Sequence, residues 1–235
     1  MSLNGVINFP QKSQFDIFIA SIPSVSSKEI ASLLDYYLLP NELKRYYNYK
    51  LSKKRLEFLF GRILIKVILS EILNIEVKEI VLDETKYGKP YLVNSENINF
   101  NLSHSNNVLA LVVSKLKVGI DIETLDQKVR FHEYKIALTK LEFEYLEDLK
   151  NEEAKSKFLT LWTKKEAFLK AIGKGLSVSP KSFQVPILET SQKNNWYFYS
   201  IINSNFVIST VIKNKRNENI MPKTHFINIL EFINN

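Results

Sequence analysis

The feature that most limits the fold of this chain is an order of predicted elements that occurs twice. Hydrophobic spacing predicts a first block with a strand at 14–20, helices at 28–38, 41–48 and 53–73, and strands at 98–102 and 108–114. A second block follows, with a strand at 117–123, helical regions at 133–149 and 152–172, and strands at 183–186, 196–203 and 205–213. This repeated helix-then-strand order predicts an α+β protein with two similar α/β lobes that share an interface.

The lobes are expected at 1–115 and 116–215, followed by a C-terminal tail at 216–235 that packs back on the N-terminal lobe. With 235 residues, 45% of them hydrophobic, the chain has enough apolar material for one large core or two modest ones. No apolar run approaches the roughly 18 residues of a membrane span, and the N-terminus lacks a secretory signal pattern, so a cytoplasmic protein is expected. The absence of cysteine excludes disulfides and thiolate metal sites.

The formal charge of +7 favours an anionic partner. Part of the excess lies between Lys44 and Lys54, where Tyr46, Tyr47 and Tyr49 are interleaved with basic residues. A basic, aromatic-rich patch can bind a nucleic-acid strand through phosphate contacts and stacking. The alternative is a solvated helix face with tyrosines packed beneath it, and composition alone does not decide between the two.

Two acidic side chains, Asp121 and Glu123, lie two residues apart in a segment that ends an apolar run. Side chains alternate in a strand, so these acids share one face while Ile120 and Ile122 point to the other. Two converging carboxylates suit a hard cation such as Mg²⁺. The plainer interpretation is the exposed face of an edge strand.

A third acid, Glu166, lies on the long predicted helix at 152–172, one turn before Lys170. Residues four apart share a helix face, so this pair places a carboxylate beside an ammonium. An ordinary surface ion pair has the same spacing. Trp162, one turn earlier on this face, has apolar neighbours in the helix and is expected in the core.

Four motifs occur together and in order, and as a set they resemble the 4'-phosphopantetheinyl transferase superfamily, in its larger pseudo-dimeric, surfactin-synthetase-activating type. The motifs are Lys86-Tyr87-Gly88-Lys89-Pro90, Phe100-Asn101-Leu102-Ser103-His104-Ser105, Gly119-Ile120-Asp121-Ile122-Glu123 and Trp162-Thr163-Lys164-Lys165-Glu166-Ala167-Phe168-Leu169-Lys170, with Gly173-Lys174-Gly175-Leu176 after the last. The resemblance implies that the two lobes form a pseudo-twofold arrangement with the active site at their interface.

The resemblance implies an enzyme that moves the 4'-phosphopantetheine arm of coenzyme A onto a serine of an apo carrier protein and releases 3',5'-ADP. It implies that Asp121, Glu123 and Glu166 hold Mg²⁺, with Mn²⁺ as an alternative. Glu166, or a water on the metal, is expected to be the base. Lys170 is expected to pair with a phosphate and keep Glu166 ionised, so the catalytic set is Glu166, Lys170 and Asp121.

The same resemblance predicts the residues that contact coenzyme A. Ser103 and His104 are expected at the pyrophosphate or the 3'-phosphate, and Lys89 beside the adenine and its phosphates. Arg45 aligns with a basic position that grips the 3'-phosphate, and Arg55 is a second candidate. Glu57 stands where many relatives have a basic residue, so Arg62 is a possible substitute or a partner in a helical salt bridge.

An acidic carrier protein and a monomer are expected, with no membrane or nucleic-acid partner. Apolar residues around Leu138, Phe143 and Leu146 are expected at the carrier surface, and Glu142 is expected to be auxiliary or structural. Two rival functions remain: a Mg²⁺-dependent hydrolase of nucleotides or of the coenzyme A pyrophosphate, and a nucleic-acid-binding domain. The second explains the charge and the tyrosines but leaves three acids among basic segments, where they would repel phosphate without a metal.

Overall fold

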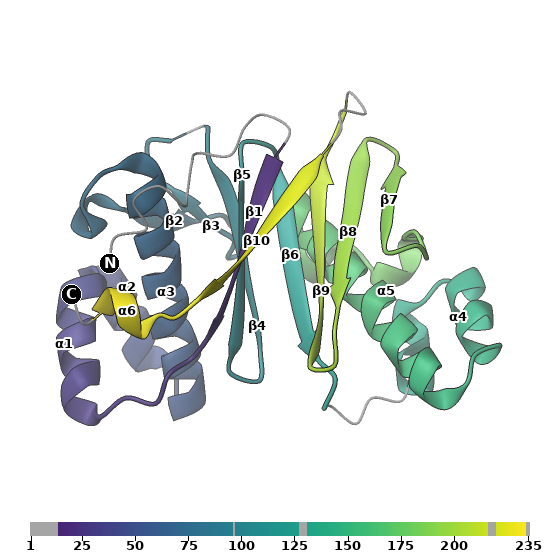
Figure 1. The fold of residues 1–235 in the computed structure, drawn as a ribbon, viewed down its shortest axis with the longest axis horizontal. Coiled ribbons are helices and arrows are strands. Elements are labelled where there is room, and N and C mark those ends of the chain that lie inside the picture. The colour runs from purple at the N-terminus through teal and green to yellow at the C-terminus, as the bar shows by residue number, and fades with distance from the viewer. Residues whose placement is uncertain (1–13, 96, 127–130, 216–219, 234–235) are drawn as a thin grey trace.

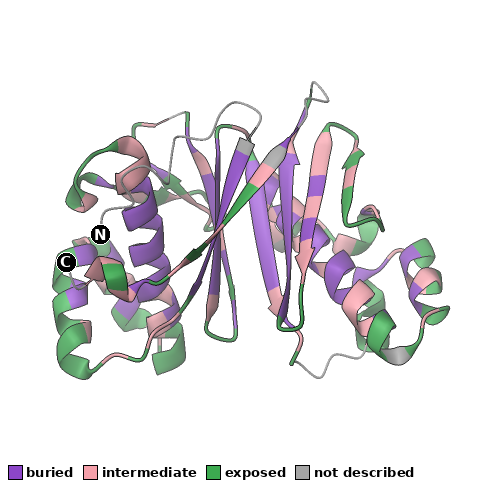
Figure 2. Cartoon of the chain, viewed as in Figure 1, coloured by how far each residue is buried: buried purple, intermediate pink, exposed green. Residues whose placement is uncertain are grey.

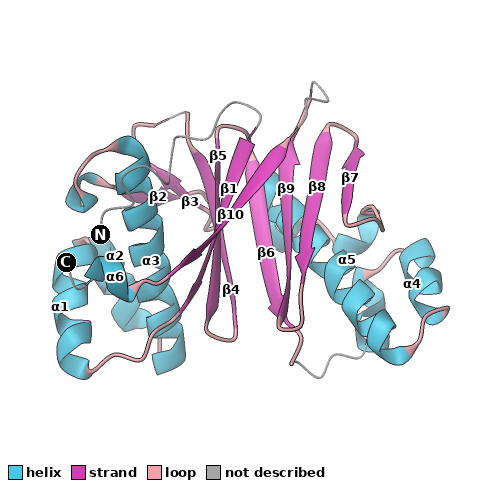
Figure 3. Cartoon of the chain, viewed as in Figure 1, coloured by secondary structure: helices cyan, strands magenta, loops and turns pink. Residues whose placement is uncertain are grey.

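The structure is a computed structural model that describes residues 14–95, 97–126, 131–215 and 220–233. In these residues two four-stranded sheets pack against each other at the centre of the molecule, and helices cover the outer face of each sheet (Figures 1 and 3). The result is a four-layered arrangement of helices, sheet, sheet and helices. The predicted α+β class with two lobes is confirmed.

The N-terminal sheet has the order β10-β1-β5-β4. It contains β1 (Gln14–Ser21), β4 (Asn99–Ser105), β5 (Val108–Ser114) and the late strand β10 (Met221–Ile227), which pairs in parallel with β1. The outer helices are α1 (Ser27–Tyr37), α2 (Pro40–Asn48) and α3 (Ser52–Leu73), with a 3-10 turn at Val77–Glu79. A separate two-stranded sheet joins β2 (Leu82–Glu84) to β3 (Pro90–Leu92), and the short helix α6 (Leu230–Ile233) follows β10.

The C-terminal sheet has the order β6-β9-β8-β7. Its strands are β6 (Val118–Thr124), β7 (Thr190–Lys193), β8 (Trp196–Ile202) and β9 (Phe206–Lys213), and its helices are α4 (Lys140–Glu147) and α5 (Asn151–Ile172). Short 3-10 segments lie at Phe131–Ala137, Gly175–Ser177 and Pro180–Ser182. The order β6-β9-β8 matches β1-β5-β4, since in each lobe the first strand pairs with the last strand of a hairpin.

Three apolar cores hold these layers together, and Figure 2 shows the buried residues concentrated in the strands and on the inner faces of α3 and α5. One core joins α1–α3 to the N-terminal sheet, one joins α4 and α5 to the C-terminal sheet, and the third lies between the sheets. Ile120 and Ile122 of β6 belong to the core between the sheets. The predicted alternation of this strand is therefore confirmed, and Asp121 points to the opposite side from that core.

Local signals explain where the main helices begin and end. Ser26 caps α1, and its hydroxyl and Glu29 form a reciprocal capping box. Thr139 and Glu142 form the same box at α4. Helix α5 ends at Gly173, whose φ of 69° is the left-handed conformation that glycine adopts without strain.

Two predicted segments differ from the structure. The helical region at 133–149 is interrupted, because a 3-10 segment ends at Ala137 and α4 starts only at Lys140 after the Thr139 cap. The strand at 183–186 is absent from the described residues: this stretch is irregular, and β7 begins at Thr190. The carbonyl groups of Phe183 and Pro186 accept hydrogen bonds from lysines of α5 instead of from a neighbouring strand.

Four strands were missed by the sequence patterns, namely β2, β3, β7 and β10. The first two have three residues each, too few for an alternation to be visible. Strand β10 contains Pro222, which is tolerated because β10 lies at the edge of its sheet. Among the described residues no helix is long and apolar enough to cross a membrane.

Candidate active site at the lobe junction

Strands β4 and β6 lie side by side where the two lobes meet, and α5 packs against β6. This packing depends on Gly119, because a Cβ built there would lie 2.1 Å from the carbonyl oxygen of Ala167 in α5. A glycine lets the strand approach the helix backbone closely. The acids of β6 are thereby brought next to the acid and the lysine of α5.

Every second residue of β4 donates or accepts a hydrogen bond across the junction. The Asn101 Oδ1 accepts from the backbone N–H of Ile120 at 2.9 Å, and the Ser103 hydroxyl donates to Asp121 Oδ1 at 2.8 Å. The Ser105 hydroxyl donates to Glu123 Oε2 at 3.0 Å. These three polar side chains fix the register between the lobes and orient both carboxylates of β6.

Lys170 closes this network from the side of α5. Its ammonium donates to Asp121 Oδ1 at 2.6 Å and to the Ser103 hydroxyl at 2.9 Å. About a quarter of the lysine side chain is exposed, while the Asp121 side chain is 8% exposed. The ammonium therefore pairs with Asp121 at one end of the site and remains open to a ligand on its exposed side.

Glu166 lies beside this pair, and the pKa of its carboxyl group is raised. Burial of its carboxyl is the main cause that raises its pKa above 4.5, the charge of Asp121 raises it further, and Lys170 only partly offsets the rise. Lys170 acts in the direction expected of it, since its charge favours the ionised form of Glu166. A carboxylate with a raised pKa is better suited to accept a proton near neutral pH.

The donor set can be compared with the needs of a divalent cation. Among the described residues, Asp121 Oδ2 and Glu166 Oε1 are buried and have no hydrogen-bond partner. Buried carboxylate oxygens without a donor are costly, and a hard cation would satisfy both. In the same part of the chain no three acidic or histidine side chains are close enough together to hold a metal ion. Asp121 Oδ2 and Glu166 Oε1 thus suit a cation in their present positions. Glu123 is the third acid nearby, and its charge raises the pKa of Glu166.

A cavity of about 250 Å³ adjoins the junction on the α3 side of β4. Its lining includes charged side chains and a histidine from α2, α3, β2 and β4, namely Arg45, Lys54, Glu57, Arg62, Glu84 and His104. Gly88 of the loop before β3 also lines it. The cavity therefore brings residues of two of the four sequence motifs, 86–90 and 100–105, next to basic residues of α2 and α3.

The charges in this cavity are paired within the protein. Glu84 accepts from the guanidinium groups of both Arg45 and Arg62. Glu57 accepts from the Lys54 ammonium at 2.7 Å, and its Oε2 lies 3.6 Å from His104 Nδ1. Sequence reasoning had treated Glu57 as a departure from a basic position, and the structure gives it a role as the counter-ion of Lys54.

His104 lies between the cavity and the carboxylate site. Burial lowers its pKa below 6.5, Glu57 partly opposes this, and Lys54, Lys170 and Asp121 also act on it. The lowered pKa favours the neutral imidazole, which can still donate one hydrogen bond.

Two expected contacts of coenzyme A lie elsewhere. The Lys89 ammonium donates to the backbone carbonyls of Val118 at 2.7 Å and of Lys170 at 2.9 Å, so it joins the N-terminal lobe to β6 and α5. Burial lowers its pKa to about 8. Arg55 donates through Nε to the Tyr49 carbonyl at 2.8 Å and does not line the cavity.

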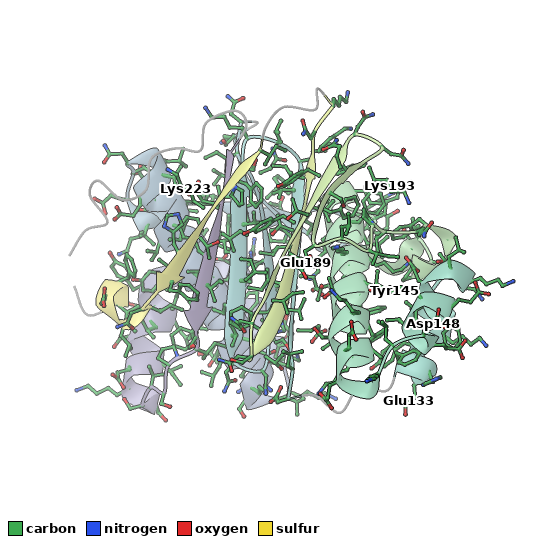
Figure 4. All side chains as sticks on the ribbon, turned by 45° about the vertical axis from the view of Figure 1, so that its right-hand side comes forward. Glu133, Tyr145, Asp148, Glu189, Lys193 and Lys223 are labelled. Atoms are coloured by element: carbon green, nitrogen blue, oxygen red, sulfur yellow. The ribbon has the colours of Figure 1, made fainter. Side chains whose placement is uncertain are left out.

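The expected carrier surface also differs from the structure. Leu138 and Leu146 are 1% and 0% exposed, so they belong to the core beneath α4. The exposed apolar side chains there are Ile136 and Leu141. Figure 4 places Glu133, Tyr145 and Asp148 around α4, at the end of this lobe away from the junction. Polar residues of the site that the sequence did not single out are Asn101, Ser105 and Glu84; an alternating polar pattern in β4 was the signal for the first two.

Comparison with known proteins gives the family. A profile described as "4'-phosphopantetheinyl transferase superfamily" matches residues 117–212, and one described as "4'-phosphopantetheinyl transferase, N-terminal" matches residues 10–116. The two matches meet between β5 and β6, at the junction of the lobes.

Individual relatives agree with these profiles. The chain is 30% identical over 176 residues to the 4'-phosphopantetheinyl transferase gsp of Aneurinibacillus migulanus, covering 72% of this chain and 70% of that protein. It is 30% identical over 134 residues to 4'-phosphopantetheinyl transferase Sfp of Bacillus subtilis, covering 57% and 59%. It is 31% identical over 189 residues to the L-aminoadipate-semialdehyde dehydrogenase-phosphopantetheinyl transferase of Rattus norvegicus, covering 68% and 61%. The alignments with the last two span less than two thirds of the relative's own length. The chain belongs to the 4'-phosphopantetheinyl transferase superfamily.

Proposed function

We propose that this protein transfers the 4'-phosphopantetheine arm of coenzyme A to a serine of an apo carrier protein and releases 3',5'-ADP. The observation that carries the proposal is the junction of the lobes. There an ammonium, a serine hydroxyl and two unpartnered carboxylate oxygens adjoin a cavity lined by arginines. The family relationship gives this arrangement its substrate class.

The cavity binds the nucleotide end of coenzyme A. Arg45 and Arg62 are the phosphate ligands there, since a guanidinium matches phosphate geometry with paired donors. His104 donates to a phosphate oxygen from its neutral imidazole. Lys170 and Ser103 face the pyrophosphate, where the exposed side of the ammonium neutralises charge that grows on the leaving group.

Asp121, Glu166 and Glu123 would hold Mg²⁺, or Mn²⁺ in its place. The two buried oxygens without hydrogen-bond partners among the described residues support this assignment. When bound, the ion would neutralise the pyrophosphate and steady the charge on the departing 3',5'-ADP.

Glu166 acts as the base in the transfer step. The serine oxygen forms a bond to the β-phosphorus, the bond from that phosphorus to 3',5'-ADP breaks, and the serine proton passes to the Glu166 carboxylate. Its raised pKa supports this role, because proton transfer is most effective when the base titrates near the working pH. The arm is then joined to the carrier as a phosphodiester.

The carrier is acidic and the enzyme is a monomer. The net charge of +7 supports an acidic partner, whose association would slow as added salt screens the attraction. A monomer follows because both halves of the junction come from one chain. We retain residues 1–115, 116–215 and 216–235 as the proposed lobes and tail.

Intact-mass analysis tests the proposal. The protein is mixed with coenzyme A, Mg²⁺ and an apo carrier protein, and the carrier mass is measured. A phosphopantetheine adduct on the carrier supports transfer. Free 3',5'-ADP and phosphopantetheine without an adduct would instead identify a hydrolase of the coenzyme A pyrophosphate, and no reaction at all would contradict both activities.

A further inference from the structure

An anionic group from the protein itself already lies in the nucleotide cavity. Glu84, the last residue of β2, presents one oxygen, Oε1, to both Arg45 and Arg62. The second of these contacts, from Arg62 Nη2, is 2.6 Å long. A single carboxylate oxygen thus occupies the space between the two guanidinium groups of the cavity.

Arg62 has more donors than the protein satisfies. The residue is 7% exposed, and among the described residues its Nε and Nη1 have no hydrogen-bond partner. Its Nε lies 3.5 Å from Glu42 Oε1, but Glu42 is already paired through Oε2 with the Lys66 ammonium at 2.6 Å. Arg62 lines the cavity, and a guanidinium suits an anion that presents several oxygens.

The two partners of this ion pair are held with unequal firmness. Arg62 belongs to the 22-residue helix α3, and its side chain is 8% exposed. Glu84 belongs to a three-residue strand in a two-stranded sheet, and its side chain is 26% exposed. Small two-stranded sheets are marginally stable by themselves. Glu84 therefore has a route to solvent that Arg62 lacks.

We propose that Glu84 is a built-in competitor for coenzyme A: in the unliganded protein its carboxylate occupies the position of a phosphate between Arg45 and Arg62, and the bound nucleotide displaces it. This inference rests on the proposed function and adds a regulatory residue to that site. A phosphate presents several oxygens to the two guanidinium groups, whereas Glu84 presents one oxygen to both.

A purely positioning role for Glu84 has the opposite consequence. If the carboxylate served to hold the two arginines in place for the ligand, its loss would weaken nucleotide binding. If it competes with the ligand, its loss strengthens binding while the unliganded protein becomes less stable, because Arg62 loses the nearer of its two carboxylate partners and keeps only Glu42 at 3.5 Å. The two roles therefore predict opposite signs for one measurement.

The test uses Glu84→Gln in the full chain, with isothermal titration of coenzyme A in the absence of a carrier. The competitor role predicts a Kd for coenzyme A that is lower by about 3- to 10-fold, as expected for removing a partly exposed competing ion pair. The Tm of the unliganded variant should fall by about 2 to 4 °C. An unchanged or higher Kd in a folded variant would overturn the inference.

Asp83→Asn is the matched control. Asp83 lies on the same strand and its substitution makes the same change of charge, but its carboxylate contacts the Tyr91 hydroxyl and does not line the cavity. If Asp83→Asn binds coenzyme A with a Kd close to that of the wild type, the effect of Glu84 is local. If both variants bind coenzyme A more tightly by the same factor, the change in net charge explains the effect and the inference is overturned. Wild-type protein that transfers the arm while Glu84→Gln binds no more tightly would sink the inference and leave the proposed function standing.

Discussion

The two lobes contain the same supporting contacts, but only the C-terminal lobe carries the carboxylates of the candidate site. In the N-terminal lobe Glu42, at the third position of α2, accepts from the Leu39 N–H and pairs with Lys66 of α3. In the C-terminal lobe Glu142, at the third position of α4, accepts from the Thr139 N–H and pairs with Lys165 of α5. Both lysines lie at the same place in a helix of 22 residues. A buried ion pair that links a short helix to a long helix is thus a shared structural element.

The lobes differ at the neighbouring positions. Val67 follows the buried lysine in α3, whereas Glu166 follows it in α5. In β1 the residue between the two core isoleucines is Phe18, and in β6 it is Asp121. The duplicated framework therefore places its helices in the same way twice, and a few substitutions on one copy create the acidic site.

The largest expected effect is on the transfer rate, from a substitution in the C-terminal lobe. Replacing Glu166 with Gln removes the proposed base but keeps the size of the side chain, so the transfer rate should fall by about 10²- to 10⁴-fold with unchanged unfolding. Carrier mass over time measures the rate. The control is Glu71→Gln in α3, at the position equivalent to Lys170, which should keep wild-type activity; equal losses in both variants would contradict the assignment.

The next effect tests the shared framework. Lys165→Met leaves Glu142 buried without its ammonium partner, whereas Lys66→Met leaves Glu42 with Arg62 at 3.5 Å. Lys165→Met should lower the free energy of unfolding by about 3 to 5 kcal/mol and Lys66→Met by less, measured by urea denaturation. If only one of the two variants loses stability, the Glu42–Lys66 and Glu142–Lys165 pairs occupy equivalent positions but do not contribute alike to the free energy of unfolding.

A smaller effect is expected from adding one methyl group at a glycine of each lobe. Gly119→Ala would press against the Ala167 carbonyl and the Ala171 N–H, so it should cost about 1 to 3 kcal/mol of folding free energy and disturb transfer. Gly61→Ala would meet only the end of the Leu102 side chain, which can rotate away. Urea denaturation of both variants should give the larger loss for Gly119→Ala, and the reverse order would argue against close packing of β6 on α5.

The smallest effect concerns pH. Burial lowers the pKa of Lys164 in α5 to about 8, whereas α3 has Ile65 at the equivalent position. The unfolded lysine titrates near 10.5, so between pH 8 and 10.5 the unfolded chain binds more protons and folding stability rises with pH. Lys164→Met should remove one group's share of this slope, at most about 1.4 kcal/mol per pH unit. Urea denaturation at pH 7.5 and 9.5 measures it; an unaltered slope would be inconsistent with a buried ammonium.

Sequence patterns predicted the long helices well because their apolar spacing is strong. The helix predicted at 53–73 is α3, Ser52–Leu73, and the one at 152–172 is α5, Asn151–Ile172. The stretch at 183–186 was predicted as a strand because it alternates. The buried lysines of α5 take its carbonyl groups instead, a tertiary contact that no local pattern records.

In the site, too, motifs predicted which residues belong together, but not the tertiary contacts that each side chain makes. The motifs predicted Asp121, Ser103 and Lys170 in one site, and the structure places the three side chains within hydrogen-bond distance of one another. For Lys89 and Arg55 the resemblance predicted only that a cation lies near coenzyme A. Which partner each cation takes depends on carbonyl groups elsewhere in the chain, those of Val118, Lys170 and Tyr49.

The parallel pairing of β10 with β1 has a consequence for how the chain acquires its structure during synthesis. Strand β1 is made first, but its outer neighbour is not available until residue 227 has left the ribosome. The sheet of the second lobe uses only residues between 118 and 213, so it can close while the first sheet still exposes one edge. An exposed strand edge invites pairing with other chains. Nascent protein halted before β10 should therefore depend on chaperones more than the complete chain does.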